Sequence, residues 1–442
     1  MKKCLIIGSG IAGLTAASIL SSKKIPVTIL ESSPKFGGRT YSFKDSVSGE
    51  TIDNGQHILM GCYDETLSFI KLIGAENNFL YQDNLCVKFL TNDKKEFSIC
   101  ASSLPYPVNL LFALLDYNIF DFIDKMRFIG FVLKLPFISK RSLQNLSVSD
   151  WLERENQNEK IIKSFWEILC VGALNTNTQK ASAKIFYDVL IKIFFTGNFA
   201  STIILPKHGL SESIIDPAIS FINKNGGSVI PSETIREFIF KDNKLVRINS
   251  DKNNYEDFDF VISAIPLHAL QKIIPAELLN IKLNLSYSTI LNIHIWVKEN
   301  PVREKFYGLI NSPLHWIFRH DKHLNIVISD ADELSKKTNE EIIDMTMIEL
   351  EKFTEIKKQL IDNYKIIREK RATFIPDKNI IIDRPNSRTN INNLFLAGDW
   401  TNTGLPSTIE SAAKSGRIAA EMILSEINNL CYAHLIKTFE VF

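Results

Sequence analysis

The first residues of the chain carry the pattern that most restricts its fold. Residues 3–7 (KCLII) form a short apolar run, and a glycine-rich turn, GSGIAG at 8–13, follows at once. A helix-like segment, 14–20, and a second apolar run, 26–30, come next. Short apolar runs on either side of a glycine turn and a helical segment predict a strand, a helix and a second strand. Because G-x-G-x-x-G lies between the first strand and the helix, this order predicts a dinucleotide-binding unit.

Each residue type in the turn has a physical task. Gly8 allows the tight turn, Gly10 lets the backbone approach a diphosphate, and Gly13 lets the helix pack closely on the strand. Ile11 and Ala12 open the helix, where free N–H groups and the positive end of the dipole attract phosphate. These residues therefore predict the phosphate-binding part of the site.

A second group of residues extends the predicted site. Glu31 ends the second strand, where a carboxylate accepts hydrogen bonds from ribose hydroxyls. Gly37, Gly38, Arg39 and Thr40 follow within a few residues. They resemble the G-G-R-x signature of the flavin amine oxidase and phytoene desaturase superfamily, in which this segment lies along the diphosphate of FAD. The resemblance implies that the two glycines permit close approach and that Arg39 binds phosphate.

A matching element lies near the other end of the chain. Residues 393–397 (NLFLA) predict a buried strand, and a G-D pair, a loop and a helix follow. In the same superfamily this element closes the FAD site, and the helix N-terminus points at the pyrimidine edge of the flavin. The residues concerned here are Gly398, Asp399, Ser407, Thr408 and Ile409. No cysteine occurs between 390 and 425, so the expected cofactor is non-covalent FAD.

These elements predict an α/β (α+β) fold with two domains. The first is a discontinuous FAD-binding, Rossmann-like domain of the glutathione-reductase type, built from residues 1–65, 200–265 and 385–425. The segments at 228–236 and 259–266 resemble the strands that complete the FAD domain in the superfamily. This resemblance implies that the backbone of Ile235 lies near adenine. The second is an inserted substrate domain of mixed sheet and helices, formed by 66–199 and 266–384. Residues 426–442 are left as a C-terminal tail.

Composition excludes several classes of protein. The 51 basic and 50 acidic side chains give a net charge of +1, so we expect no nucleic-acid partner. Six cysteines without C-x-x-C spacing predict reduced, buried thiols, and no metal site is expected. No apolar stretch reaches the ~18 residues of a membrane span, and no convincing signal cleavage site follows the first apolar run. The expected location is therefore cytoplasmic, in solution or peripheral to the inner face of the membrane.

Residues 104–138 are rich in Leu, Ile and Phe and are interrupted by single charges. This periodicity predicts helices with an apolar face. Two interpretations remain open: a helix pair in the core of a large domain, or an apolar channel wall or mouth that contacts a membrane.

Further stretches narrow the resemblance within the superfamily. They are residues 52–57, which contain DNGQH, with 61–63; residues 166–170 and 173–176 with 181–183; residues 205–206 with 216–218; and residues 369–374. With these, the chain resembles the hydroxysqualene dehydroxylases (squalene-associated FAD-dependent desaturases) of bacterial squalene and hopanoid synthesis, up to about residue 425. The resemblance implies that hydroxysqualene loses its hydroxyl group, gains a hydride from reduced FAD, and leaves as squalene. Such a site needs a positioned acid, a dry apolar tunnel for a long isoprenoid, and an electron donor that the sequence does not identify.

Asp53 and His57 are the candidate acids, because the DNGQH block follows the early FAD segment. An imidazole titrates near neutral pH. The alternative is that this block only fixes a loop by hydrogen bonds. Four further residues are expected to line the site without any order among them: Asn175, His208, Trp400 and Glu410.

Three other functions share this fold. A carotenoid or phytoene-type desaturase would also bind a long polyene, but with oxidised flavin. An amine oxidase with non-covalent FAD is a second alternative. The third is a prenyl-protein chaperone without redox chemistry, which the intact G-D pair and the T-I-E helix start at 408–410 disfavour.

Overall fold

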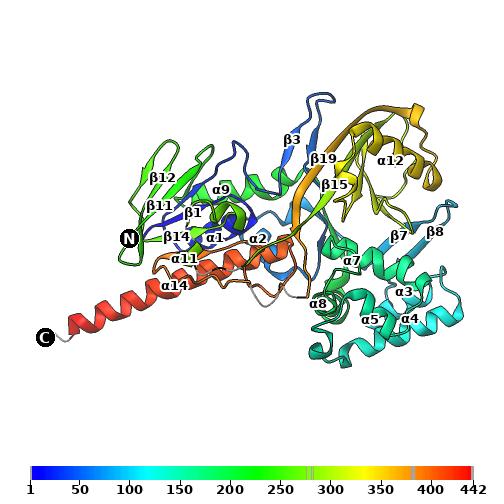
Figure 1. Ribbon diagram of the computed structural model, residues 1–442, viewed down its shortest axis with the longest axis horizontal. Coiled ribbons are helices and arrows are strands. Elements are labelled where there is room, and N and C mark those ends of the chain that lie inside the picture. Colours follow the sequence, from blue (N-terminus) through cyan, green and yellow to red (C-terminus); the bar gives the residue numbers. More distant parts are fainter. Residues whose placement is uncertain are drawn as a thin grey trace.

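The computed structural model describes residues 2–439 except 275, 280, 282, 379 and 381–383. Figure 1 shows a parallel sheet at the end that carries both termini, and a second sheet with a cluster of helices at the opposite end. Among the described residues, no helix combines the length and the apolar character needed to cross a membrane.

Five parallel strands form the first sheet, in the order β10-β2-β1-β14-β20. They are β1 (Cys4–Ile7), β2 (Val27–Leu30), β10 (Ser228–Ile230), β14 (Phe260–Ser263) and β20 (Leu394–Leu396). The N-terminal strand is central, so Cys4 pairs with Val27 on one side and with Phe260 on the other. Segments that are far apart in sequence therefore meet in one sheet.

Three helices cover one face of the parallel sheet. They are α1 (Ile11–Ser22), α9 (Asp216–Lys224) and α14 (Ile409–Phe439). Ile6 of β1 and Ile262 of β14 share an apolar core with Leu14 of α1. Because successive side chains of a strand point to opposite faces, these alternate residues define the face that the helices bury.

The opposite face packs against a small antiparallel sheet. Its strands are β11 (Ile235–Lys241), β12 (Lys244–Ser250) and β13 (Asn254–Tyr255). Leu5 and Val261 of the parallel sheet share an apolar core with Phe238 and Leu245. Burial on both faces explains why the parallel strands are apolar runs rather than alternating ones.

A seven-stranded mixed sheet forms the second part of the molecule, in the order β19-β15-β18-β17-β16-β7-β8. Its strands are β7 (Cys86–Leu90), β8 (Glu96–Cys100), β15 (Tyr287–Val297), β16 (Phe306–Leu309), β17 (Trp316–Arg319), β18 (His323–Ile328) and β19 (Ile361–Phe374). The long antiparallel strands β15 and β19 run side by side from this sheet towards the parallel sheet (Figure 1). They carry residues of the second part of the molecule to the edge of the first.

A cluster of helices packs beside β7 and β8 (Figure 1). It contains α3 (Val108–Leu115), α4 (Phe122–Lys134), α5 (Val148–Arg154), α6 (Glu159–Ile161), α7 (Glu167–Leu174) and α8 (Ala183–Phe195). Several of these helices begin with a side-chain cap. The Asp121 carboxylate accepts from the N–H of Asp124 at the start of α4, and Ser147 forms a capping box with Asp150 at the start of α5. Their buried faces meet around Phe128 and Trp166.

The remaining elements are short or peripheral. The helices are α2 (Asp64–Leu72), α10 (Leu267–Leu270), α11 (Ala276–Leu279) and α12 (Asn339–Phe353), with single turns or π-helical segments at 76–78, 135–137, 140–143, 162–166, 199–201, 211–215, 334–336 and 358–360. β3 (Ser42–Lys44) pairs with β4 (Thr51–Asp53), and β9 (Ile203–Pro206) pairs with both β5 (Leu59–Met60) and β6 (Phe79–Tyr81).

The predicted mixed fold is confirmed. All strands of the parallel sheet fall in 1–65, 200–265 and 385–425, and all strands of the seven-stranded sheet fall in 66–199 and 266–384. The domain boundaries themselves stay a prediction. Part of the expected tail, 426–439, is helical because α14 continues through it.

The prediction of reduced cysteines is wrong for one pair. Cys86 and Cys100 are directly opposite in the β7–β8 hairpin and form a disulfide. Cys4, Cys62 and Cys170 are free and buried. Spacing could not predict the pair, because the hairpin register, and not sequence distance, brings the two sulfur atoms together.

The packing of α1 on β1 predicts the effect of adding one methyl group. A Cβ at Gly13 would lie 2.0 Å from the carbonyl oxygen of Gly8, whereas a Cβ at Gly130 in α4 would meet nothing within 4 Å. We expect Gly13→Ala to lower the free energy of unfolding by about 1–3 kcal/mol. Gly130→Ala should raise it by about 0.5–1 kcal/mol. Denaturant titration of the two variants checks this, and equal stability would contradict the close packing.

Candidate functional site

A cavity of about 460 Å³ lies where β1, β2, β14 and β20 end. Residues that directly follow the carboxyl ends of these strands line it, which is where open parallel sheets bind ligands. Fourteen of the predicted cofactor residues line the cavity: Gly8, Gly10, Ile11, Ala12, Glu31, Gly37, Gly38, Arg39, Thr40, Gly398, Asp399, Ser407, Thr408 and Ile409. The fold therefore brings the N-terminal and C-terminal motifs into one site.

Glycine backbones form the floor of the cavity. Gly10 forms an isolated bridge with Gly37, and a Cβ at Gly38 would lie 3.2 Å from the Cα of Gly10. A Cβ at Gly10 itself would meet nothing within 4 Å, so open space lies directly above that backbone at the start of α1. This arrangement fits a diphosphate, because it offers helix N–H groups and room for close approach.

Glu31 is held at the end of β2 by three strong hydrogen bonds. One carboxylate oxygen accepts from the backbone N–H and the hydroxyl of Ser9, at 2.9 and 2.7 Å, and the other accepts from the N–H of Ser33 at 2.8 Å. The side chain is nearly buried but lines the cavity. Its position suits the predicted ribose contact.

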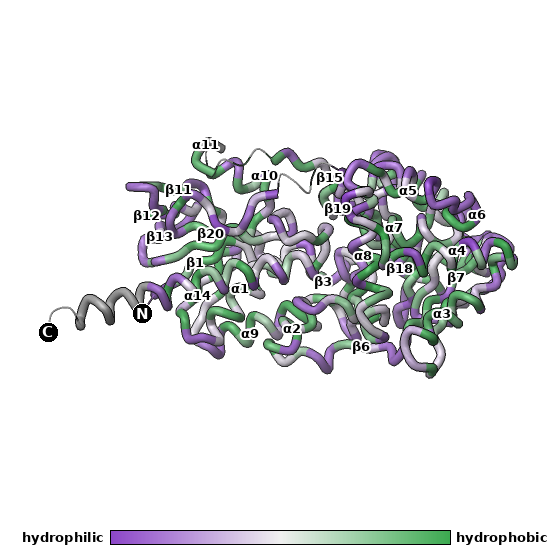
Figure 2. Tube along the Cα trace, turned by 90° about the horizontal axis from the view of Figure 1, so that it is seen from below, coloured by the Kyte–Doolittle hydropathy of each residue, from purple (hydrophilic) through white to green (hydrophobic). Residues whose placement is uncertain are grey.

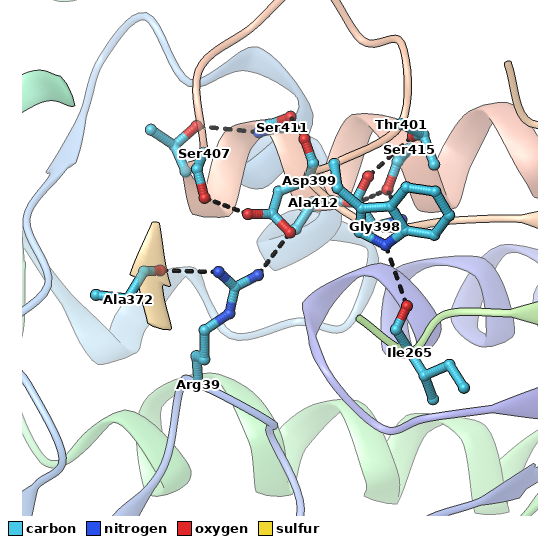
Figure 3. A network of polar contacts seen from close by, with 12 residues as sticks. Arg39, Ile265, Ala372, Gly398, Asp399, Thr401, Ser407, Ser411, Ala412 and Ser415 are labelled. Atoms are coloured by element: carbon cyan, nitrogen blue, oxygen red, sulfur yellow. Dashed lines mark hydrogen bonds and ion pairs between the residues drawn. The ribbon is translucent and has the colours of Figure 1, made fainter. Parts of the chain in front are cut away.

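An ion pair joins the two halves of the cavity wall (Figure 3). Arg39 lies 2.5 Å from the Asp399 carboxylate and also donates to the carbonyl oxygen of Ala372 at 2.8 Å. The hydroxyl of Ser407 donates to the second carboxylate oxygen of Asp399. Burial by itself raises the pKa of Asp399, but the ion pair with Arg39 and the hydrogen bond from Ser407 lower it by a larger amount. The pKa therefore lies below its ordinary value, and the group is ionised at neutral pH. The predicted contact of Arg39 with phosphate stays a prediction.

Sequence reasoning missed Arg384, which shapes the loop before α14. Its guanidinium is buried and donates to the carbonyl oxygens of Asp399 and Leu405, both at 2.6 Å, and to the hydroxyl of Thr403 at 2.9 Å. These bonds satisfy carbonyl groups that would otherwise be unpaired in the protein interior. No motif surrounds Arg384 in the sequence, so no local signal could have identified it.

Three of the predicted cofactor residues and candidate acids lie outside the cavity lining. Gly13 acts behind it, in the contact of α1 with β1. Ile235 starts β11, and its contact with adenine stays a prediction. Asp53 is buried, and its carboxylate accepts from the Ser42 hydroxyl at 2.6 Å and from the Leu210 N–H at 2.9 Å. Burial raises the pKa of Asp53 to about 6.

His57 lines the cavity, as a catalytic group must. Its Nδ1 lies 2.9 Å from the carbonyl oxygen of Gly55, and since a carbonyl only accepts, Nδ1 carries the proton. Burial lowers the pKa of His57, and the nearby Arg39 lowers it further. The ring is therefore mainly neutral at pH 7, with Nε2 as an acceptor.

The four residues expected to line the site without any order among them lie in different places. Asn175 and Trp400 line the same cavity, and Glu410 lines the neighbouring one. His208 lines neither; it lies on the surface, 4.0 Å from Glu212.

Two residues of the second part of the molecule bind the DNGQH block and Asn175, and sequence reasoning did not name them as site residues. Asn292 of β15 accepts from the N–H of Gln56 at 3.2 Å and packs against Gly55. Thr373 of β19 accepts from the Asn175 amide at 3.0 Å. Both residues line the cavity, but only the pairing of β15 with β19 brings them there.

A second, apolar cavity of about 220 Å³ adjoins the first. It lies between β7, α3, α7 and α8 and is lined mainly by Leu, Ile, Val and Phe; below it is called the apolar tunnel. Six residues line both cavities: Ile58, Tyr63, Gly172, Ala173, Trp316 and Thr408. A molecule in the tunnel would therefore meet the larger cavity at this shared wall.

Few charged groups line the apolar tunnel. The Glu410 carboxylate is buried and accepts from the N–H groups of Glu65 and Thr66, at 3.1 and 2.9 Å, at the start of α2. Burial raises the pKa of Glu410. Asp188 and Lys192 of α8 are the other two charged lining residues.

The glycine cradle, the acid at the end of β2 and the α14 N-terminus define a dinucleotide-dependent enzyme. Residues 11–424 match the model of the flavin containing amine oxidoreductases, and the chain belongs to this family of flavin-dependent oxidoreductases. It is 29% identical to the hydroxysqualene dehydroxylase of Zymomonas mobilis subsp. mobilis over 95% of this chain and 98% of that protein. It is 24% identical to the 15-cis-phytoene desaturase of Glycine max over 96% of this chain and 79% of that one. The predicted resemblance to hydroxysqualene dehydroxylases is thus confirmed.

Among solved structures, an oxidoreductase from Methanosarcina mazei superposes with a TM-score of 0.73 at 18% identity, covering 96% of this chain and 100% of that one. This likeness supports the fold.

The raised pKa of Asp53 predicts how stability changes with pH. A carboxyl whose folded pKa exceeds its unfolded value of 3.8 stabilises the fold below that value, and this contribution is lost as the pH rises through about 6. Asn at this position keeps the oxygen that accepts from Ser42 and Leu210 but cannot ionise. We expect Asp53→Asn to match the wild type near pH 4 and to exceed its stability by about 1–3 kcal/mol near pH 8.

Thermal unfolding across this pH range measures the difference, with the exposed Asp83→Asn as the control. A pH-independent difference between Asp53→Asn and wild type would show that the charge is not responsible.

Proposed function

We propose that the chain catalyses the reductive dehydroxylation of hydroxysqualene to squalene, with non-covalent FAD in the 460 Å³ cavity. The observation that carries the proposal is the apolar tunnel that shares a wall with this cavity. A thirty-carbon hydrocarbon chain gains free energy by leaving water for such a lining, at roughly 25 cal/mol per Å². The similarity to a protein named hydroxysqualene dehydroxylase supports the same substrate.

The reaction balances as follows. A proton adds to the hydroxyl oxygen, the carbon–oxygen bond breaks, and water leaves with the bonding electron pair. Bound against Gly10, Gly38 and Arg39, FAD in its reduced form would supply the hydride of the new carbon–hydrogen bond, and an external two-electron reductant would be needed for each turnover. The protein's task is to position the alcohol, supply the proton and exclude bulk water, since water would capture the allylic cation.

We propose His57 as the proton donor, acting from Nε2 in its charged form. Its Nδ1–H···O bond to Gly55 orients the ring, and His57 is one of the lining residues of the cavity. Asp53 has a different task in this proposal: through Ser42 and Leu210 it fixes the segment that precedes His57.

A phytoene-type desaturase is the second candidate, since an apolar lining also suits a long polyene and the Glycine max relative bears that name. It would use oxidised flavin, so the direction of electron flow separates the two. An amine oxidase is less well supported, because most of the tunnel lining is apolar.

The proposal predicts turnover by the reduced protein alone. Protein that is reduced with dithionite under anaerobic conditions and then given hydroxysqualene should form squalene in step with flavin reoxidation. Mass spectrometry measures the squalene, and absorbance measures the oxidised flavin. Gly172→Leu should keep the flavin spectrum but lose at least about tenfold in rate, since Gly172 lines both cavities and faces Trp316. Gly130→Leu, at an exposed position of α4 that lines neither cavity, is the control. Unchanged hydroxysqualene beside fully reduced flavin would reject dehydroxylation.

A general acid with a lowered pKa predicts a specific pH profile. The single-turnover rate should fall as the pH rises from about 5 to 8, because the protonated fraction of His57 decreases through this range. His57→Gln should be slower by about 10²–10⁴-fold and lose this pH dependence. Flavin absorbance of both proteins controls for cofactor loss. The same pH profile in His57→Gln would assign the proton to another group.

A further inference from the structure

Large apolar side chains are exposed along the segment that contains α3 and α4. Of those exposed in the described part of the chain, nine lie between residues 104 and 137: Leu104, Val108, Phe112, Leu115, Phe122, Ile123, Met126, Leu133 and Phe137. Phe137 is 87% exposed and Phe122 is 76% exposed. These nine residues are called the α3–α4 apolar surface below. Clusters of this kind mark a surface that another apolar phase covers.

The surface follows from helices that are apolar on both sides. The inner side of α4 buries Phe128 and Phe131 in the aromatic core around Trp166. Its outer side exposes Ile123 and Met126. A helix that covers a protein core normally presents polar residues to water on its other side. The outer side of α4 therefore departs from the pattern expected for a helix that faces only water.

Basic residues flank the most exposed aromatic side chain. Lys134 precedes Phe137, and Lys140 and Arg141 follow it. The side chains of Lys134 and Lys140 are each 57% exposed, although they pair with Glu155 and Asp188. Residues 104–143 carry five basic and three acidic side chains. Exposed aromatic and aliphatic groups beside lysine and arginine match the interface of a bilayer that contains anionic lipid.

Two other basic residues of α4 are less suited to lipid contact. Lys125 donates to the carbonyl oxygen of Leu115 at 2.5 Å, and Arg127 lies 3.6 Å from Asp124. Lys125 and Arg127 are also less exposed than Lys134, Lys140 and Arg141, so the basic residues around Phe137 are the better candidates for headgroup contact.

Helix α3 also forms part of the tunnel wall. Leu114 of α3 lines the apolar tunnel, while its neighbours Phe112 and Leu115 are exposed. Both views place α3 and α4 at the end of the molecule opposite the two termini (Figures 1 and 2). Contact at this end would leave the parallel sheet in water and put the tunnel wall next to the lipid.

We propose that the α3–α4 apolar surface docks on an anionic lipid bilayer, with Phe122, Ile123 and Phe137 inserted at the level of the headgroups. The basic residues beside Phe137 contact the lipid phosphates. The part of the proposal that concerns substrate entry rests on the proposed function: an isoprenoid dissolved in the bilayer reaches the tunnel past α3 without crossing water. The docking itself requires no substrate.

Vesicle flotation tests the docking directly. The flavin-loaded full chain is mixed with vesicles of zwitterionic lipid, alone or with anionic lipid. The wild type should float, and more of it with anionic lipid. Phe122→Ser/Ile123→Ser/Phe137→Ser should lower the bound fraction about tenfold or more. The matched control is Val47→Ser/Val246→Ser/Ile348→Ser, which removes three exposed apolar side chains elsewhere and should float like the wild type.

Flavin absorbance and thermal unfolding establish that both triple variants are folded. Wild-type protein that stays in the soluble fraction with both vesicle types would overturn the proposal, as would equal flotation of the α3–α4 variant. If light scattering finds a wild-type dimer that this variant converts to a monomer, without vesicle binding, the surface is a subunit interface instead. Because no substrate is present, these outcomes are independent of the dehydroxylation test.

Discussion

The site depends on how closely helix α1 packs between the parallel sheet and α14. A Cβ at Gly13 would lie 2.0 Å from the carbonyl oxygen of Gly8, and one at Gly416 would lie 2.2 Å from the carbonyl oxygen of Ala12. At both contacts backbone meets backbone, and no side chain could be accommodated. Since protein interiors are close-packed, this leaves α1 little freedom relative to β1 and α14. The N-termini of both helices are thereby held at one cavity, where their dipoles favour negative charge.

The Arg39–Asp399 pair and the Arg384 network complete the wall that this packing begins. Arg39 joins the G-G-R segment to Asp399 and to the end of β19 through Ala372. Arg384 holds the loop that leads to α14. Asp399 and Arg384 are buried, and because leaving a buried charge unpaired is costly, each of them constrains its partners as much as it is constrained by them. A ligand that bridges the two motifs would add to contacts that already exist.

Polar and apolar recognition are divided between two adjoining cavities. Charged groups and backbone N–H groups surround the larger cavity, whereas the tunnel is mainly apolar and its buried acid, Glu410, already caps α2. Such a division suits a reaction in which a hydrocarbon must approach a polar cofactor without water. The exposed apolar residues of α3 and α4 extend the apolar side of this division to the surface.

The sequence by itself determined the elements whose structure is set by neighbouring residues. The turn at 8–13, the buried strands around it, the G-G-R segment and the start of α14 were predictable because glycine freedom, helix N-termini and apolar runs act locally. Tertiary structure alone decided the rest. Asp53 and His57 belong to the same DNGQH block, yet Asp53 binds Leu210 outside the cavity lining, whereas His57 lines the cavity. Likewise, Arg384 and the Cys86–Cys100 disulfide depend on loop closure and strand register, and no spacing along the chain specifies which distant backbone a side chain will meet.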